Sequence, residues 1–215
     1  MSRTLTATSR LRAEDGRVFE LDVARWMAPA DEVDERLLDR VVGPVLDVGC
    51  GPGRHVGSLR RRGVAALGVE ISPTAVALAR RRGARVLQRS VFDHLPGRGR
   101  WRSALLLDGS IGIGGDPRAL LGRLRDLLHP HGLVLIETEA PGSATEQLRV
   151  RLETSRGTGP WFAWARVGAD DASVLATDCG YEELESFVLD DRHFTMLRRG
   201  TNAARNGGKD ASPRR

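Results

Sequence analysis

The sequence predicts a doubly wound α/β fold, in which a mostly parallel sheet carries an antiparallel closing strand. Short apolar segments that resemble strands alternate with longer segments that have helical spacing. Helix starts are marked by the pairs Ser72-Pro73 and Asp116-Pro117, which combine an N-cap with a proline in the first turn. Crossover segments of this length connect parallel neighbours with right-handed geometry.

The elements follow in a regular order from residue 31 onward. Apolar residues recur at helical spacing between Val33 and Val42, after the acidic pair Asp31 and Glu32, which predicts a helix. A helix is also expected from Ser72 to Gly83, and another begins at Asp116. The strands are expected at residues 45–48, 65–70, 85–90, 101–108 and 132–138.

The regular alternation of expected strands and helices ends after the fifth strand. Residues 140–166 mix turn residues with an alternating stretch, which suits an insert or lid over the sheet edge. A helix over 169–179 and an antiparallel pair of strands then close the fold. The chain of 215 residues is therefore expected to form one domain over 1–199, with an N-terminal helical region at 1–42 and a disordered basic tail at 200–215.

Composition excludes several classes of protein. The net charge of +5 is carried almost entirely by arginine, since Lys209 is the only lysine, so it argues only weakly for an anionic partner. Cys50 and Cys179 lack the spacing of a zinc site or a disulfide framework, and no metal site is expected. The histidines at 94, 129, 131 and 193 show no ligand spacing either. No apolar run suggests a signal peptide or membrane span, which predicts a cytoplasmic protein.

The segment VLDVGCGPG, residues 45–53, places three glycines at alternate positions after a buried strand. Arg54 and His55 follow where a phosphate-binding P-loop needs Lys and Ser or Thr, and the spacing is not that of a dinucleotide site. Glycine in such a turn also serves packing alone. However, Glu70 ends the next strand 17 positions after Gly53, where a carboxylate can accept both hydroxyl groups of a ribose.

The motifs together resemble the class I S-adenosylmethionine-dependent methyltransferases, which have a Rossmann-like sheet. Asp47 to Gly53 is similar to their first motif, and Glu70-Ile71-Ser72 is similar to their ribose-binding acid and helix cap. RSVFDHLP, LLLDGSIGIGGDP and LHPHGLVLIE resemble the later motifs in the expected order, across residues 20–198. The resemblance implies an enzyme whose cofactor is S-adenosylmethionine.

The resemblance also implies roles for single residues. Asp47 and the glycine turn would meet the methionine part of the cofactor, Glu70 the ribose and Ile71 the adenine. Ser90 stands where the family often has an aspartate, which leaves the backbone N–H of Val91 to bond the ring. We expect Phe92 to anchor the core and Asp93 to form a turn. The expected cofactor-binding residues are Asp47, Gly49, Cys50, Gly51, Gly53, Glu70, Ile71, Ser90, Val91, Asp108 and Gly109.

Catalytic and acceptor-binding residues are less defined. Methyl transfer requires alignment and exclusion of water, and a general base only if the acceptor starts protonated. No residue is assigned as that base; His55, Asp108 and Glu137 are the candidates near strand ends, and each also suits a structural role. In PWFAW, residues 160–164, Trp161 or Trp164 would wall the acceptor pocket, unless these rings form a small satellite core.

Three hypotheses about function remain. The motif of enzymes that methylate nucleobase amines is absent, because the fourth strand ends in Asp108-Gly109-Ser110-Ile111, and no Pro-Cys pair is present. A small-molecule acceptor is therefore the first hypothesis, with nucleic acid disfavoured. The alternatives are an RNA or protein methyltransferase that uses the arginine-rich surface, and an inactive S-adenosylmethionine-binding domain. The acceptor atom and the oligomeric state stay open.

Overall fold

The computed structural model describes residues 9–200, so residues 201–215 of the predicted basic tail lie outside the described residues. The main sheet has seven strands in the order β10-β11-β7-β6-β3-β4-β5. Strands β3 to β7 run parallel, whereas β11 pairs antiparallel with β7 and β10 pairs antiparallel with β11. The predicted fold class is therefore confirmed. The strands are β3 (Val45–Val48), β4 (Ala66–Glu70), β5 (Val86–Gln88), β6 (Trp101–Leu106), β7 (Leu128–Thr138), β10 (Tyr181–Leu189) and β11 (Arg192–Arg199).

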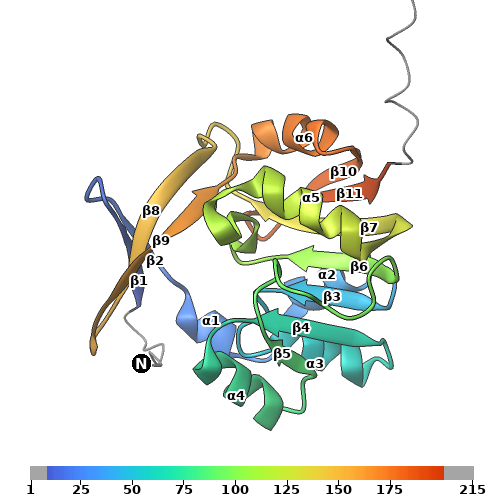
Figure 1. The fold of residues 1–215 in the computed structure, drawn as a ribbon, viewed down its shortest axis with the longest axis horizontal. Helices are drawn as coiled ribbons and strands as arrows, with labels where there is room; N and C mark the ends of the chain where they lie inside the picture. Colours follow the sequence, from blue (N-terminus) through green and yellow to red (C-terminus); the bar gives the residue numbers. More distant parts are fainter. Residues whose placement is uncertain (1–8, 201–215) are drawn as a thin grey trace, which may run out of the picture.

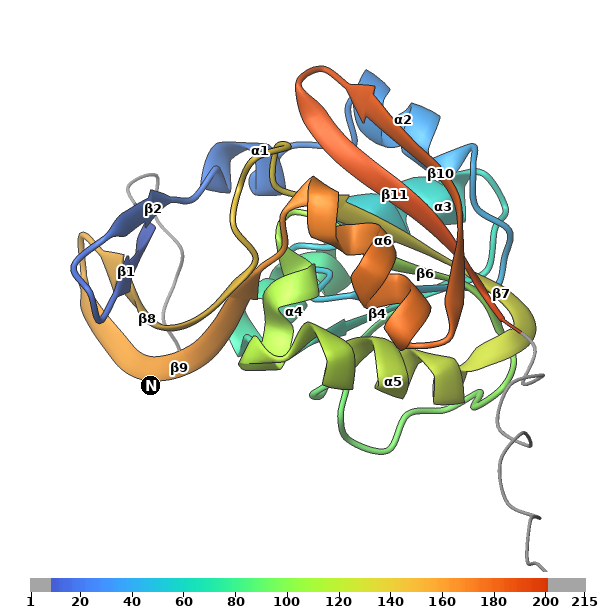
Figure 2. The ribbon, with the colours of Figure 1, turned by 90° about the horizontal axis from the view of Figure 1, so that it is seen from above.

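Helices cover both faces of this sheet (Figure 2). One apolar cluster joins the sheet to α5 (Pro117–Leu127) and α6 (Ala169–Asp178), and a second joins its other face to α2 (Glu32–Leu38) and α3 (Arg54–Arg61). The predicted caps form as expected: Ser72 accepts a hydrogen bond from the N–H of Ala75 at the start of α4 (Pro73–Arg81), and Asp116 caps α5. Within residues 9–200, none of the helices is both long and apolar enough to cross a membrane.

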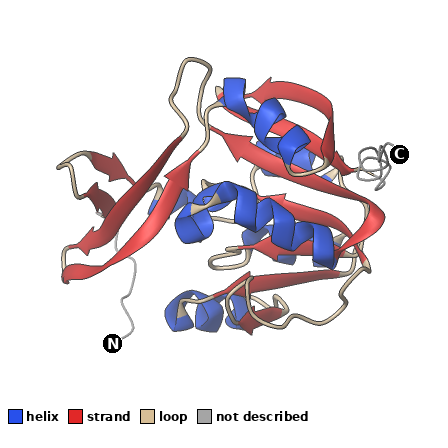
Figure 3. Cartoon of the chain, turned by 45° about the horizontal axis from the view of Figure 1, so that its top comes forward, coloured by secondary structure: helices blue, strands red, loops and turns tan. Residues whose placement is uncertain are grey.

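A second, smaller sheet stands beside the main one (Figures 1 and 3). It is antiparallel, in the order β2 (Val18–Glu20), β1 (Arg10–Ala13), β8 (Glu146–Thr154) and β9 (Gly157–Arg166). The hairpin β8–β9 accounts for most of the predicted insert at 140–166. The expectation of a helical N-terminal region over 1–42 is wrong for residues 10–20, because Leu11 and Ala13 pair with the distant strand β8 and pack on Val150. Helices α1 (Val23–Met27) and α2 follow only afterwards.

Glycines bring the small sheet against the end of the main sheet. A 3₁₀ helix over Ser110–Gly115 follows β6, and β9 packs directly on it. A Cβ atom on Gly112 would lie 2.0 Å from the carbonyl oxygen of Ala165, and one on Gly115 would lie 2.7 Å from the Cβ of Ala163. Only glycine permits this approach, so the glycine-rich segment after β6 fixes the position of β9.

Candidate active site

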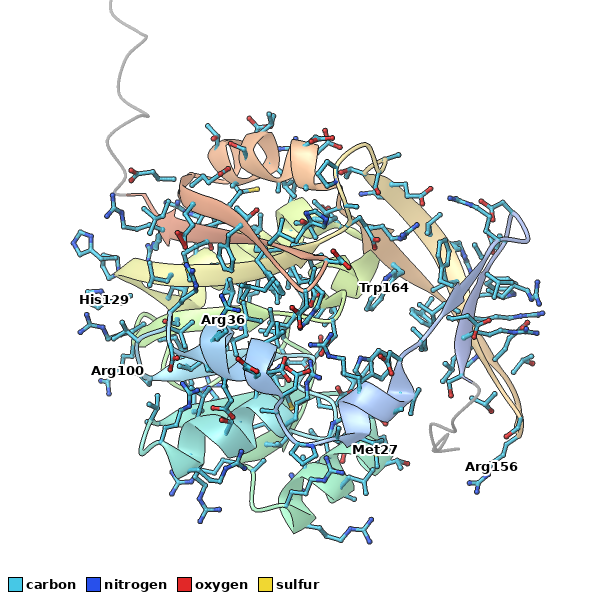
Figure 4. The ribbon with its side chains drawn as sticks, turned by 180° about the vertical axis from the view of Figure 1, so that it is seen from behind. Met27, Arg36, Arg100, His129, Arg156 and Trp164 are labelled. Carbon is cyan, nitrogen blue, oxygen red and sulfur yellow. The ribbon has the colours of Figure 1, made fainter. Side chains whose placement is uncertain are left out.

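A cavity of about 580 Å³ lies between the two sheets, at the carboxyl ends of the parallel strands. Its volume suits small ligands. Figure 4 labels Trp164 on β9 between the two sheets and Arg156 at the far tip of the β8–β9 hairpin. The main sheet supplies the floor, while α1 and the hairpin supply walls on the other side. The lining includes Trp26 from α1, Leu152 from β8, and Phe162, Ala163 and Trp164 from β9.

The three glycines of the turn after β3 serve different purposes. All three have positive φ angles, of 70°, 51° and 79°. A Cβ on Gly49 would lie 2.8 Å from Ile113 Cδ1, and one on Gly53 would lie 2.9 Å from the Cβ atoms of Ala79 and Ala84. In contrast, a Cβ on Gly51 would meet no atom within 4 Å, and Gly51 lines the cavity. Gly49 and Gly53 therefore serve packing, and Gly51 keeps space open for a ligand.

Glu70 closes the turn from the end of β4. Its Oε2 accepts a hydrogen bond from the N–H of Gly51 at 3.1 Å, and its Oε1 accepts one from the N–H of Ser72 at 2.7 Å. Burial raises the pKa of Glu70, against the lowering effect of these backbone donors. Two backbone segments thus hold the carboxylate on the wall of the cavity.

Asp47, on β3, is the buried acid of the cavity floor. Its Oδ2 has no hydrogen-bond partner among the described residues, and the nearest cationic group is His55 Nδ1 at 3.7 Å. A buried carboxylate oxygen without a donor is costly unless a ligand supplies one. This orphan oxygen, the open side of Gly51 and the carboxylate of Glu70 fit a ligand that carries an amino group and a ribose.

A network of buried charges lies beside this floor. Arg54, the first residue of α3, is paired with Asp108 at the end of β6, at 2.8 Å. Asp34 of α2 is fully buried and lies within 3.5 Å of cationic nitrogens on Arg25, Arg54, His55 and Arg192. Each charge of this network thus has an opposite partner, as a low-dielectric site requires.

Asp108 is held by Arg54 at its carboxylate and by Glu137 at its backbone N–H. Its own N–H donates to Glu137 Oε2 at 2.6 Å, and Glu137 is paired with Arg192 through two hydrogen bonds of 2.6–2.7 Å. The backbone of Asp108 has a φ of 52°. Burial raises the pKa of Asp108, and the nearby Arg54 and His55 offset only part of this effect. Asp108 lines the cavity with 21% of its side chain exposed, whereas Glu137 stands behind it.

His55 lies between two carboxylates. Its Nε2 is 3.3 Å from Asp34 Oδ1 and 3.2 Å from Arg54 Nε, and its Nδ1 faces Asp47. Burial lowers the pKa of His55, but Asp34 and Asp47 outweigh burial and Arg54 and raise it to about 9. Nε2 contacts protein groups and Nδ1 lies 3.7 Å from Asp47 Oδ2, so His55 is placed to orient the two acids.

Most of the predicted cofactor residues line this one cavity. Asp47, Gly49, Cys50, Gly51, Glu70, Ile71, Ser90, Val91 and Asp108 do so. Gly53 and Gly109 do not: Gly53 packs on α4, and Gly109 lies beside the ring of Trp164. Asp93 forms the expected turn by accepting from the N–H of Ser90, but Phe92 is not a core anchor, since its exposed ring lines the cavity.

The two tryptophans that are candidates for acceptor contact lie on opposite faces of β9. Trp164 lines the cavity, whereas Trp161 lies on the opposite face of β9 beneath Arg151, whose guanidinium carbon is 4.9 Å from the ring centroid. Alternation along the strand places Phe162 on the cavity side instead. Of the three candidate bases, His55 and Asp108 reach the cavity and Glu137 does not.

Several lining residues were not singled out from the sequence. Trp26, Arg54, Leu152 and Phe162 all line the cavity. Arg54 follows the glycine turn directly, but its partner Asp108 is 54 positions further on, and no local pattern connects them. Phe162 pairs with Val150, two residues from Leu152, so assignment of this segment as a hairpin would have placed Leu152 and Phe162 on one face.

A family model described as a methyltransferase domain matches residues 24–168. A methyltransferase from Bacteroides fragilis, solved with S-adenosylhomocysteine, is 20% identical with a TM-score of 0.75, and the match covers 92% of this chain and 90% of that one. The 1,6-didemethyltoxoflavin N1-methyltransferase of Burkholderia thailandensis is 20% identical with a TM-score of 0.60, over 83% and 81% of the chains. A sugar N-methyltransferase of Streptoalloteichus is 20% identical with a TM-score of 0.57, over 81% and 88%. No curated protein matches the sequence.

The chain belongs to this family of methyltransferase domains, because the family model covers most of it. The resemblance to the class I S-adenosylmethionine-dependent methyltransferases is thereby confirmed. The chain is therefore a methyltransferase domain, and its fold is that of solved S-adenosylmethionine-dependent methyltransferases.

Proposed function

We propose that this enzyme transfers the methyl group of S-adenosylmethionine to a small-molecule acceptor bound beneath the small sheet. The observation that carries the proposal is a single cavity with two chemically different ends. One end holds Gly51, Glu70 and the orphan oxygen of Asp47; the other holds Asp108 and aromatic rings. Both partners of the reaction would therefore find complementary groups in one cavity.

The residues of the first end suit the parts of the cofactor. Glu70 would accept hydrogen bonds from the ribose hydroxyls, and Asp47 would face the amino group of the methionine part. The exposed apolar side chains of Ile71 and Phe92 line the same wall and would pack on the adenine. S-adenosylmethionine supplies an activated methyl group on a sulfonium, so the protein itself provides no covalent intermediate.

The chain's own residues bind, align and receive a proton. We place Asp108 as the group that accepts the acceptor's proton, because it is the reachable carboxylate of the network and its pKa is raised. Arg54, His55 and Glu137 hold it and Asp47 in place. The small sheet covers the cavity and excludes water, which favours transfer to the acceptor over loss of the methyl group to water.

A small acceptor suits the size of the cavity and its cover. The solved relatives include enzymes whose names specify 1,6-didemethyltoxoflavin or a sugar as the acceptor. A large polymer would have to pass the hairpin β8–β9 and the side chain of Trp26 to reach Asp108.

The test is formation of S-adenosylhomocysteine from S-adenosylmethionine in the presence of a panel of small metabolites, total RNA and a mixture of proteins. We expect turnover with one or more metabolites and none with the polymers, and we expect Gly51→Val to abolish it. Turnover that requires RNA or protein would contradict the proposed acceptor class.

A further inference from the structure

The acceptor end of the cavity contains an aromatic ring that the protein leaves uncovered. Phe162 is 37% exposed, although it lies on the inner, apolar face of the small sheet. On that face Val150 is fully buried and Leu11 is 8% exposed, because side chains of the neighbouring strands β1 and β8 pack against one another there. Phe162 instead lines the cavity, so its ring is available to a bound molecule.

Trp164 fixes the orientation of that ring. The two rings meet edge to face, with centroids 6.1 Å apart and planes at 89°. Trp164 itself is held against the 3₁₀ helix, where a Cβ on Gly112 would lie 2.9 Å from its indole ring. An edge-to-face pair leaves a ring face free, and a flat aromatic molecule fits such a face by offset stacking.

The polar groups at this end are few. Asp108 is the carboxylate at this end of the cavity, and Arg54 and His55 are bound within the charge network. The neighbours Leu107, Ile113 and Leu152 are apolar, and Ser110 adds one hydroxyl group whose Oγ has no hydrogen-bond partner among the described residues. A sugar would bring several hydroxyl groups into this space and leave most of them without partners, which costs affinity for each one.

The charge balance favours a neutral acceptor. Asp108 lies against the guanidinium groups of both Arg54 and Arg192, so its charge is compensated before any ligand binds. An aliphatic amine, protonated at neutral pH, would place a further cation beside these two. A phenol, an aromatic amine or a ring N–H of a heteroaromatic compound is neutral and can donate to Asp108.

Resting on the proposed function, we infer that the acceptor is a flat aromatic or heteroaromatic molecule that stacks on Phe162 and points an N–H or O–H group at Asp108. In the transfer, the acceptor's nitrogen or oxygen forms a bond to the methyl carbon as the bond from that carbon to sulfur breaks. The electron pair of the broken bond stays on sulfur, and the acceptor's proton passes to Asp108.

A matched pair of probes tests the inference. 2-Naphthol and decahydro-2-naphthol share one hydroxyl group and a similar size, but only the first is flat; glucosamine represents a charged sugar. Calorimetry first measures S-adenosylhomocysteine binding, and then each probe is titrated into the loaded enzyme. We expect 2-naphthol to bind about tenfold more tightly than its saturated counterpart, the scale of one aromatic stacking contact, and glucosamine not to bind.

Variants identify the ring involved. Phe162→Ala and Phe162→Leu should weaken 2-naphthol binding while S-adenosylhomocysteine affinity is retained, which shows that the variants are folded. Trp161→Ala, next to it on the opposite face, is the matched control and should bind both as the wild type does. Equal or tighter binding of decahydro-2-naphthol or glucosamine, no binding of 2-naphthol, or unchanged binding in both Phe162 variants would overturn the inference. Failure of S-adenosylhomocysteine to bind would instead overturn the proposed function.

Discussion

Arg54 donates through one nitrogen, Nη2, to both carboxylate oxygens of Asp108, at 2.9 and 2.8 Å. Arg54 is the first residue after the glycine turn, and Asp108 follows the end of β6. This ion pair therefore connects the part of the cavity proposed for the cofactor with the part proposed for the acceptor. The Arg54 side chain of this contact is buried, so we expect a substitution of either residue to affect both parts of the cavity.

Asp108→Asn tests the proton-accepting role. The amide can still accept a hydrogen bond from Arg54, but it cannot take up a proton from the acceptor. We expect kcat to fall by about 10²–10⁴-fold, the usual contribution of a general base, while S-adenosylmethionine affinity changes little. The exposed Asp126, changed to Asn in the same way, should leave kcat unaltered. A wild-type kcat in Asp108→Asn would remove Asp108 from the mechanism.

Glu70→Ala tests the ribose contact. Loss of hydrogen bonds to a charged group should weaken S-adenosylmethionine binding by about 1.5–3 kcal/mol, and Glu70→Asp should lose less because a carboxylate remains. Titration calorimetry with both variants measures the difference. If both bind like the wild type, Glu70 only ties the N–H groups of Gly51 and Ser72 together.

Gly51→Val tests the open side of the turn. A side chain at a φ of 51° is strained by roughly 1–2 kcal/mol, and it would also fill the space kept for the ligand. Gly63→Val is the matched control, because Gly63 has a φ of 73° and also has no atom within 4 Å of its Cβ position, but it does not line the cavity. Both variants should lose stability, measured by chemical denaturation, and only Gly51→Val should lose S-adenosylmethionine binding. Normal binding by Gly51→Val would show that the ligand lies elsewhere.

The pH dependence of stability tests the charge network around His55. The pKa of His55 is raised to about 9 in the folded chain, from an ordinary value of about 6.5. Its contribution is therefore fully present below about pH 6.5 and is lost as the pH rises through 9. Asp34 and Asp47 face the ring as anions, and Arg54 faces it as a cation. We expect the free energy of unfolding to fall between pH 6.5 and 9 in the wild type and to change less in His55→Gln. Equal slopes in the two proteins would show that His55 does not titrate in this range.

Local signals predicted the centre of the fold. Strand β3 has the predicted bounds because an apolar run is cut off sharply by glycine, and α4 and α5 begin at their predicted caps. Strands β1 and β2 were not predicted, since β1 pairs with β8, where Arg10 lies opposite Glu153, and β2 pairs in turn with β1. Pairing across such a distance in the sequence has no local pattern, and tertiary contacts override local preference.

Within the site, too, local motifs could be predicted and contacts between distant residues could not. Gly51 and Glu70 were found because the motif that carries them is short and continuous. The pair Arg54–Asp108 and the buried hub Asp34 were not, because their partners come from α1, α2, α3, β6 and β11. The prediction that Trp161 or Trp164 contacts the acceptor did not use the geometry of a strand, in which residues 161 and 164 point to opposite faces. The aromatic cluster was located correctly, but its cavity-facing ring besides Trp164 is Phe162.

Calorimetry of the wild-type chain with S-adenosylmethionine, S-adenosylhomocysteine and NAD tests the central claim most directly. The glycine turn, Glu70 and the orphan oxygen of Asp47 suit an adenosyl ligand with an amino group and provide no pyrophosphate site. We predict saturable binding of S-adenosylmethionine and S-adenosylhomocysteine at one site per chain, with little or no binding of NAD. Preferred binding of NAD, or no binding of either adenosyl compound, would contradict the account.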